Sequence, residues 1–178
     1  KKIKTIIVGG GEVHPDLKMM IEQHPSRIFE TYGMTETITH IALRPLNQAA
    51  GFRAEQIGFK ALPGVSFEID DRNCLIIKAP KISSEQVVTN DVVDLDSETS
   101  FRWLGRYDHI INSGGIKFVP EVLEKKLNPI IEERFFIGCL PDKILGQKII
   151  LLVEGAVQKD LQSKLIRFQN QHAKDLSK

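Results

Sequence analysis

The first third of the chain alternates short apolar runs with turn residues, in the order strand, glycine turn, helix, strand, strand. Residues 3–8 form an apolar run typical of a buried strand, and three glycines follow at 9–11. Residues 15–24 predict a short helix that begins with a proline, which is well tolerated in a first helical turn. Residues 27–31 and 39–43 predict two more strands. This order indicates the end of an α/β sheet whose earlier strands lie outside the sequence.

The middle of the chain has a different pattern, in which short β-rich segments alternate with turn residues. The segments are residues 57–61, 65–69, 75–78, 87–89 and 101–104. Proline, glycine, aspartate and asparagine separate several of them, which is typical of hairpins. We therefore expect a small antiparallel sheet or a distorted barrel in this region.

The pattern changes again after Gly105. A turn-rich stretch leads to a helix over about 120–131, then to strands at 134–139 and 148–154, and finally to an amphipathic helix over about 157–173. Apolar residues at helical spacing in the last helix predict a face that packs on a core, and they are Leu161, Leu165 and Phe168.

These patterns predict two domains, residues 1–106 and residues 107–178. The first combines the end of an α/β sheet with a small β-rich subdomain. The second is a small α+β domain. The predicted fold class is therefore a mixture of α/β and α+β.

The composition of the chain argues against several classes of function. Apolar residues make up 42% of the chain and the net charge is +1, which gives no reason to expect nucleic acid or an anionic membrane as a partner. The longest apolar stretches, such as residues 149–153, are too short to cross a bilayer. Cys74 and Cys139 lie in strand-like apolar runs, which predicts reduced core thiols in a cytoplasmic protein rather than a disulfide or a metal site.

Candidate chemistry begins with a polar segment directly after the second predicted strand. It contains Tyr32, Gly33, Thr35 and Glu36. Open α/β sheets bind ligands at the carboxyl ends of their strands, where this segment is expected to lie. An aromatic ring, a hydroxyl and a carboxylate can serve for base stacking, a phosphate hydrogen bond and Mg²⁺ coordination. The alternative is a polar loop with a core tyrosine.

A second candidate is the segment Thr89-Asn90-Asp91, which ends a β-rich run. A single aspartate can accept hydrogen bonds from both hydroxyls of a ribose. Aspartate is also common in ordinary turns, so this segment alone leaves both interpretations open.

A third candidate is the long segment over residues 105–121. Arg106 offers a fork of donors to a ribose or a phosphate, and Gly114-Gly115 permits a backbone approach too close for a side chain. The alternative is a plain hairpin between a sheet and a helix.

In their order and spacing these segments resemble core motifs of the AMP-binding superfamily of adenylate-forming acyl-CoA synthetases. The resemblance covers essentially the whole chain and corresponds to the C-terminal half of such an enzyme. The matching segments are Val8 to Glu12, Tyr32 to Thr37, Thr89 to Asp91 and Gly105 to Gly115.

The resemblance implies a site for ATP or AMP and Mg²⁺ in the first domain. Gly9, Gly10 and Gly11 would border the adenine together with Tyr32. The other implied contacts are Thr35 with the α-phosphate, Glu36 with Mg²⁺, and Asp91 with the ribose, with Arg106 nearby.

The resemblance also implies a hinge at Asp108, between a large domain and a small mobile one. The Gly114-Gly115 loop would swing in for the second half-reaction and line the tunnel for the pantetheine arm of coenzyme A. One departure is Asn90, where the family usually has glycine; asparagine tolerates left-handed backbone angles, so Asp91 can still be presented.

Two family elements have no counterpart in the sequence, namely the phosphate-binding loop and the C-terminal lysine motif. The chain is therefore expected to be a piece of a larger enzyme, inactive by itself, that works with the missing N-terminal half. A homodimer is one option for the assembled enzyme, and the sequence leaves the oligomeric state open. The intact enzyme would convert a small carboxylic acid to an acyl-adenylate and then to a CoA thioester.

The motifs look most like those of o-succinylbenzoate–CoA ligases of menaquinone biosynthesis. The alternatives are a fatty-acyl or aryl-acid CoA ligase and a non-catalytic nucleotide-binding fragment. If the acid is a dicarboxylate, its distal carboxylate needs donors, and Thr39, His40 and Arg44 are candidates by their position after the Mg²⁺ motif.

Overall fold

The structure is a computed structural model that describes residues 3–51, 58–155 and 160–172. It divides into two compact units, Lys1–Trp103 and Leu104–Lys178. The division falls inside a strand, a few residues before the boundary expected after residue 106. Parts of two predicted elements, residue 57 and residues 157–159 and 173, lie outside the described residues.

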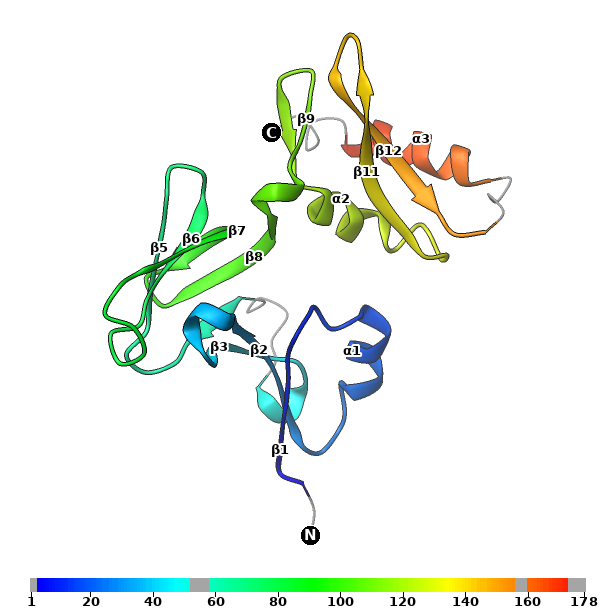
Figure 1. Cartoon of the computed structure of the whole chain (residues 1–178). Coiled ribbons are helices and arrows are strands. Elements are labelled where there is room, and N and C mark those ends of the chain that lie inside the picture. Colours follow the sequence, from blue (N-terminus) through cyan, green and yellow to red (C-terminus); the bar gives the residue numbers. More distant parts are fainter. Residues whose placement is uncertain (1–2, 52–57, 156–159, 173–178) are drawn as a thin grey trace. The chain divides into compact units, whose positions relative to one another are not determined.

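One eight-stranded sheet forms the frame of the first unit, with the order β1-β2-β3-β4-β8-β7-β6-β5 (Figure 1). β1 pairs with β2 in parallel, whereas β2–β3, β3–β4, β4–β8, β5–β6 and β6–β7 are antiparallel. The strands are β1 (Thr5–Val8), β2 (Arg27–Gly33), β3 (His40–Pro45), β4 (Phe59–Ala61), β5 (Ser66–Ile69), β6 (Cys74–Lys78), β7 (Val87–Ser97) and β8 (Ser100–Arg106).

The β-rich strands expected to make a sheet of their own instead continue the sheet begun by β1 and β2. The link is β4, which pairs with β3 on one side and with β8 on the other. The predicted mixture of α/β and α+β structure is confirmed, and the observed fold is dominated by its sheets. The antiparallel pairing expected for the middle strands is present, and β4 joins these strands to the first sheet without a break in hydrogen bonding.

Two apolar clusters hold the first unit together. The larger lies on the antiparallel strands, and its completely buried side chains include Phe67, Phe101, Ile41, Leu75 and Ile77. The smaller cluster consists of Val13, Ile28 and Leu46, and Ile21 of α1 (Pro15–Ile21) packs against it. Two short 3₁₀ helices complete the unit, η1 (Thr35–Thr37) and η2 (Gln48–Ala50).

The second unit packs two helices with a four-stranded sheet of order β10-β9-β12-β11. Its core consists of Ile111, Leu127, Ile131, Ile137 and Leu161, with Leu165 and Phe168 packed against it, so the predicted apolar face of the last helix is confirmed. The elements are η3 (Tyr107–His109), β9 (Ile111–Ser113), β10 (Ile116–Phe118), α2 (Pro120–Leu127), β11 (Phe135–Asp142), β12 (Gly146–Val153) and α3 (Leu161–His172).

Helix α2 is shorter than the predicted helix over about 120–131. Its last helical residue is Leu127, and Asn128 forms the C-cap. Pro129 follows, and a proline inside a helix lacks the N–H donor and clashes with the carbonyl of the preceding turn. The proline therefore ends the helix even though apolar residues continue beyond it.

Only one of the two cysteines among the described residues is a core residue. Cys74 is buried, as predicted, whereas Cys139 on β11 is exposed, so the prediction of a core thiol was wrong there. The β11–β12 hairpin continues past the part of its sheet that α2 and α3 cover (Figure 1). Leu140 and Ile144 near its tip are exposed for the same reason.

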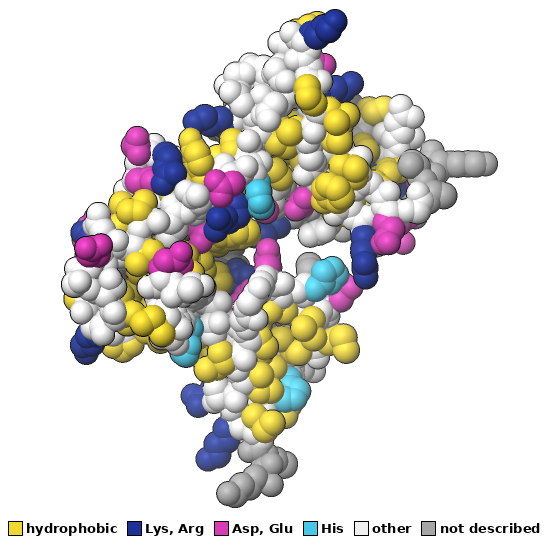
Figure 2. Space-filling model, viewed as in Figure 1, with side chains coloured by type: hydrophobic (Ala, Val, Ile, Leu, Met, Phe, Trp, Pro, Cys, Tyr) yellow, Lys and Arg dark blue, Asp and Glu magenta, His cyan; other side chains and the backbone are white. Residues whose placement is uncertain are grey.

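No helix among the described residues has the length and apolarity required to traverse a lipid bilayer. Acidic and basic side chains are intermixed on the face of the molecule shown in Figure 2, where neither sign forms a continuous patch.

Candidate functional site

A cavity of about 320 Å³ opens in the first unit, next to the glycine loop that follows β1. It brings together four residues predicted for nucleotide binding, Gly10, Gly11, Tyr32 and Gly33. Its other lining residues are Glu12, Glu30, Thr31, Arg44, Phe59 and Trp103.

The glycines allow the loop to run close to β2. A Cβ atom on Gly9 would overlap Oγ1 of Thr31, and Gly10 has a φ of +95°, which L side chains rarely adopt. Because neither position accepts a side chain without rearrangement, the backbone itself forms this side of the cavity. A flat ligand could therefore lie directly against the peptide groups.

Two aromatic side chains that line the cavity, those of Tyr32 and Trp103, form hydrogen bonds with the buried carboxylate of Asp91. Asp91 is 5% exposed, and its Oδ2 accepts a hydrogen bond from the Tyr32 hydroxyl at 2.5 Å. Its Oδ1 accepts one from Nε1 of Trp103 at 3.2 Å. The Tyr32 ring packs edge-on against Phe101, 5.0 Å between centroids, so it is fixed by packing as well as by hydrogen bonding.

An ion-pair network forms another side of the cavity. Glu30 is 2% exposed, and its two oxygens accept from the Val13 N–H at 3.1 Å and from Nε of Arg44 at 2.6 Å. Arg44 also lies 3.6 Å from Glu12 and over the ring of Phe59. A buried carboxylate requires such partners. The charge of Arg44 is thus already matched by two carboxylates, those of Glu12 and Glu30. Its suggested role as a donor to the distal carboxylate of the substrate stays a prediction.

Thr35 and Glu36 lie in η1, directly after β2, and both are exposed. The buried hydroxyl of Thr37 holds this loop, because it accepts from the Met34 N–H at 3.0 Å and donates to the Thr39 carbonyl oxygen at 2.9 Å. The loop therefore has a defined conformation while Thr35 and Glu36 remain exposed.

The residues present fit a magnesium ion that is held largely by its substrate. Within residues 3–51, 58–155 and 160–172 no three His, Cys, Asp or Glu side chains gather as a metal site. Mg²⁺ is commonly bound by one or two carboxylates together with substrate phosphates and water. Glu36, exposed on η1, can supply one such carboxylate.

A strained residue follows the loop. Ile38 has a φ of +63° and is 82% exposed, and the Thr39 N–H bonds to the Thr37 carbonyl across it at 2.6 Å. This is the rarer, positive-φ form of the γ-turn, which is unfavourable for a β-branched residue. Strain of this kind concentrates at functional sites.

The other predicted residues belong to the second unit. Nη2 of Arg106 lies 3.1 Å from Oδ2 of Asp108, so the guanidinium is paired within its own segment. Gly114 and Gly115 form the two-residue turn between β9 and β10, with φ values of +60° and +85°. Both left-handed angles match the hairpin turn that suits the twist of paired strands, for which glycine is favoured.

Sequence reasoning missed four residues that line the cavity, namely Glu30, Thr31, Phe59 and Trp103. These residues lie on three strands, and β2, β4 and β8 come together only through the order of the sheet. Trp103 carried one usable signal, because it is the single tryptophan of the chain and its indole N–H needs an acceptor when it is partly buried.

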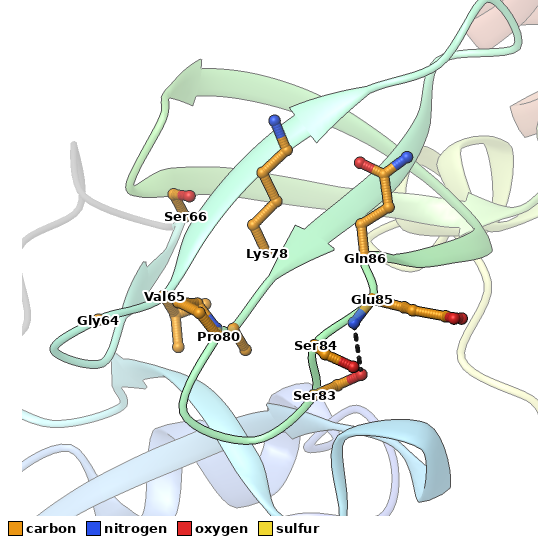
Figure 3. A pocket seen from close by; sticks show the side chains of 10 residues that line it. Gly64, Val65, Ser66, Lys78, Pro80, Ser83, Ser84, Glu85 and Gln86 are labelled. Atoms are coloured by element: carbon orange, nitrogen blue, oxygen red, sulfur yellow. Dashed lines mark hydrogen bonds between the residues drawn. The ribbon is translucent and has the colours of Figure 1, made fainter.

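A second cavity, of about 640 Å³, lies between β5 and the loop that leads into β7 (Figure 3). Its lining includes Ser66, Lys78, Ser83 and Gln86, and no residue predicted for chemistry is among them. Lys78 is ion-paired with Glu68. This cavity therefore adds nothing to the candidate site.

Comparison with known proteins gives a consistent set of relatives, although no family model matches the chain. The 2-succinylbenzoate–CoA ligase of Listeria innocua is 24% identical over 94% of this chain and 40% of its own length. The corresponding enzyme of Lactococcus lactis is 24% identical over 89% of this chain and 38% of its own length. The chain thus spans about two fifths of the length of these curated relatives.

Comparison with solved structures leads to the same kind of enzyme. An AMP-forming acyl-CoA synthetase/AMP-acid ligase II-like protein from Dyadobacter fermentans is 34% identical, with a TM-score of 0.55 over 93% of this chain and 48% of that one. Unliganded o-succinylbenzoate coenzyme A synthetase (MenE) from Bacillus subtilis has the same fold, with a TM-score of 0.75 at 20% identity, over 98% of this chain and 42% of that one. In sequence and in fold, the chain resembles the C-terminal part of the AMP-forming acyl-CoA synthetases.

Proposed function

We propose that the chain supplies the nucleotide-binding part of an ATP-dependent acid–CoA ligase whose acid is o-succinylbenzoate. The observation that carries the proposal is the cavity that gathers Gly10, Gly11, Tyr32 and Gly33, with Asp91 bound to two of its walls. The four curated relatives, each a 2-succinylbenzoate–CoA ligase, support the choice of acid.

In this proposal the adenosine of ATP occupies the cavity. The adenine lies between the glycine loop and the ring of Tyr32, where peptide planes and an aromatic face suit a flat base. The ribose hydroxyls donate to Asp91, whose carboxylate also accepts hydrogen bonds from Tyr32 and Trp103. A buried carboxylate makes a strong acceptor for them.

The phosphates extend toward η1. Thr35 donates its hydroxyl to the α-phosphate, and Glu36 would hold Mg²⁺. Bound Mg²⁺ would neutralise phosphate charge as pyrophosphate leaves. An oxygen of the acid attacks the α-phosphorus and expels pyrophosphate, so the residues of the chain act mainly by orientation and charge.

The second unit serves the thioester step. The thiol of coenzyme A loses its proton to solvent, its sulfur attacks the acyl carbonyl of the adenylate, and the carbon–oxygen bond to AMP breaks so that AMP leaves. We assign residues 1–106 to the C-terminal part of the nucleotide domain and residues 107–178 to a mobile domain, with Asp108 as the hinge. The side-chain-free turn at Gly114-Gly115 supports passage of a narrow pantetheine arm, and Arg106 is proposed to contact the ribose.

The test is pyrophosphate release by the full-length protein with ATP, Mg²⁺ and a panel of o-succinylbenzoate, benzoates and fatty acids. Release with o-succinylbenzoate, followed by thioester formation with CoA, is expected. Release with a different acid would keep the reaction and reject the substrate.

AMP binding separates the remaining outcomes. Asp91→Asn should weaken AMP binding by about tenfold or more, since a hydrogen bond to a charged group contributes about 1.5–3 kcal/mol. The matched control is Asp94→Asn on the same strand, whose carboxylate pairs with Arg102 at the surface. AMP binding without turnover of any acid would leave a nucleotide-binding protein, and absence of AMP binding would reject the proposal.

A further inference from the structure

Strand β7 contains an irregularity where it carries Asp91. β6 advances two residues from Ile76 to Cys74, while β7 advances four, from Val88 to Val92. The additional residues of β7 form a bulge at Thr89, Asn90 and Asp91. Bulges re-aim side chains next to functional sites, and they depend on local contacts because they interrupt regular pairing.

The side chain of Arg72 forms hydrogen bonds with this bulge. Arg72 Nη1 donates to Oδ1 of Asn90 at 3.1 Å, and its Nη2 donates to the carbonyl oxygen of Thr89 at 3.3 Å. The guanidinium thus holds a side chain and a backbone group of the two residues that directly precede Asp91. Its planar geometry fixes both contacts at once.

Arg72 is itself held in a rigid turn between β5 and β6. Nε of Arg72 lies 2.8 Å and Nη2 lies 2.7 Å from Oδ2 of Asp70. The other oxygen, Oδ1 of Asp70, accepts from the backbone N–H groups of Arg72 and Cys74 at 2.8 and 2.9 Å. Burial raises the pKa of the Asp70 carboxyl, but these hydrogen bonds and the Arg72 charge outweigh it and hold the pKa below its ordinary value.

The contacts continue from the bulge to the cavity. The Asp91 N–H donates to Oγ1 of Thr89 at 3.0 Å, and the Asp91 side chain binds Tyr32 and Trp103, which line the cavity. A chain of direct contacts therefore runs from Asp70 through Arg72 and the bulge to the two aromatic walls.

We propose that Arg72 is a positioning residue for the nucleotide site, and that it sets the place of the Asp91 carboxylate by holding the Thr89–Asn90 bulge. The proposal deepens the proposed function, on which it rests, because it requires that Asp91 receive the ribose hydroxyls. Arg72 acts on recognition of the sugar and leaves the binding of the base unchanged.

The test compares two probes, AMP and 2′,3′-dideoxy-AMP, with the full-length protein. Wild type should prefer AMP, because only AMP carries the hydroxyls that donate to Asp91. Arg72→Ala should weaken AMP binding by about tenfold while the affinity for the dideoxy probe stays unchanged, since a misplaced acceptor loses a charge-assisted hydrogen bond.

Three further variants complete the test. Arg72→Lys keeps the charge but cannot reproduce the fork, so an intermediate loss of preference is expected. Asn90→Ala removes one of the two contacts and should lower the preference even if Arg72→Ala fails to fold. Arg102→Ala on β8, which removes a surface pair with Asp94, is the control and should retain the full preference.

The outcomes are distinguishable. Equal affinity of wild type for both probes would reject the ribose role of Asp91 and with it the proposed function. A wild-type preference that survives in Arg72→Ala, or in Asn90→Ala should Arg72→Ala not fold, would overturn the role of Arg72 alone. Equal weakening of both probes would show that Arg72 only supports the fold, and would also overturn the inference.

Discussion

The Tyr32 hydroxyl donates a hydrogen bond of 2.5 Å to Oδ2 of Asp91, which joins β2 to β7 across 59 residues of sequence. Because Asp91 is buried, the loss of this donor leaves an acceptor without its closest partner. Two segments that the sequence presents as separate motifs are thus one structural unit.

Tyr32→Phe should therefore lower the free energy of unfolding by about 1–3 kcal/mol, the usual cost of removing one partner from a buried polar group. The aromatic ring remains, so AMP binding should weaken less than in Asp91→Asn. Urea denaturation measures the change in stability. In the double variant Tyr32→Phe/Asp91→Asn the two losses should not add, and full additivity would contradict the coupling.

Arg44→Ala should destabilise the first unit by about 3–5 kcal/mol, because Glu30 would stay buried without its cationic partner. Denaturant unfolding is the measurement. The surface pair of Arg134 and Glu154, with side chains 90% and 67% exposed, gives the control, and Arg134→Ala should cost less than about 1 kcal/mol. Adding Glu30→Gln to Arg44→Ala should restore part of the lost stability, and no restoration would argue against an unpaired charge as the cause.

Ile38→Gly should stabilise the protein by about 1 kcal/mol, because glycine adopts positive φ without the strain that isoleucine carries there. The thermal midpoint is the readout. Ile69→Gly on β5, at a position without positive φ, should lower it instead. If both variants lose stability equally, the strain at Ile38 is absent in solution.

The tip of the β11–β12 hairpin should loosen in acid. The N–H groups of Leu145 and Ile144 bond to Oδ1 of Asp142 at 2.8 Å and lower its pKa below the ordinary value near 3.8. A carboxyl with a lowered pKa in the folded state adds stability above its unfolded pKa and loses it as the pH falls through the folded pKa. The loss should therefore occur below about pH 4.

NMR provides the measurement for Asp142. The amide signals of Ile144 and Leu145 should titrate together with the Asp142 carboxyl, and Asp142→Asn should abolish that titration. Amide shifts that persist in the variant would assign the acid response to another group.

The sequence was sufficient to predict motifs whose residues are consecutive in the chain. The glycine run at 9–11, the segment from Tyr32 to Glu36 and the Gly114-Gly115 turn were all recognisable because each requires particular residue types in consecutive positions. The strands that precede the first two of these segments were also predictable, since apolar periodicity is a local property. The short strands on both sides of the Gly114-Gly115 turn, β9 and β10, were not predicted. Helix ends were less predictable: α1 ends at Ile21 rather than at residue 24, and α2 ends at Leu127, just before Pro129, rather than at residue 131.

Contacts that depend on which strands become neighbours in the sheet could not be predicted from the sequence. Phe59 and Trp103 line the cavity because β4 pairs with β8, a pairing that skips three intervening strands. Arg72 meets Asn90 through a bulge whose extra residues have no signature of their own. Such contacts arise from the register of distant strands, and a single sequence does not encode them in any one window.

The indole of Trp103 gives this chain an intrinsic optical reporter. It is the single tryptophan in the sequence, it lines the cavity, and its N–H is bound to Asp91. Tryptophan emission from the chain therefore originates at one wall of the proposed nucleotide site. Ligand entry can be followed there in real time without attaching a dye, and stopped-flow mixing would give the rate of binding.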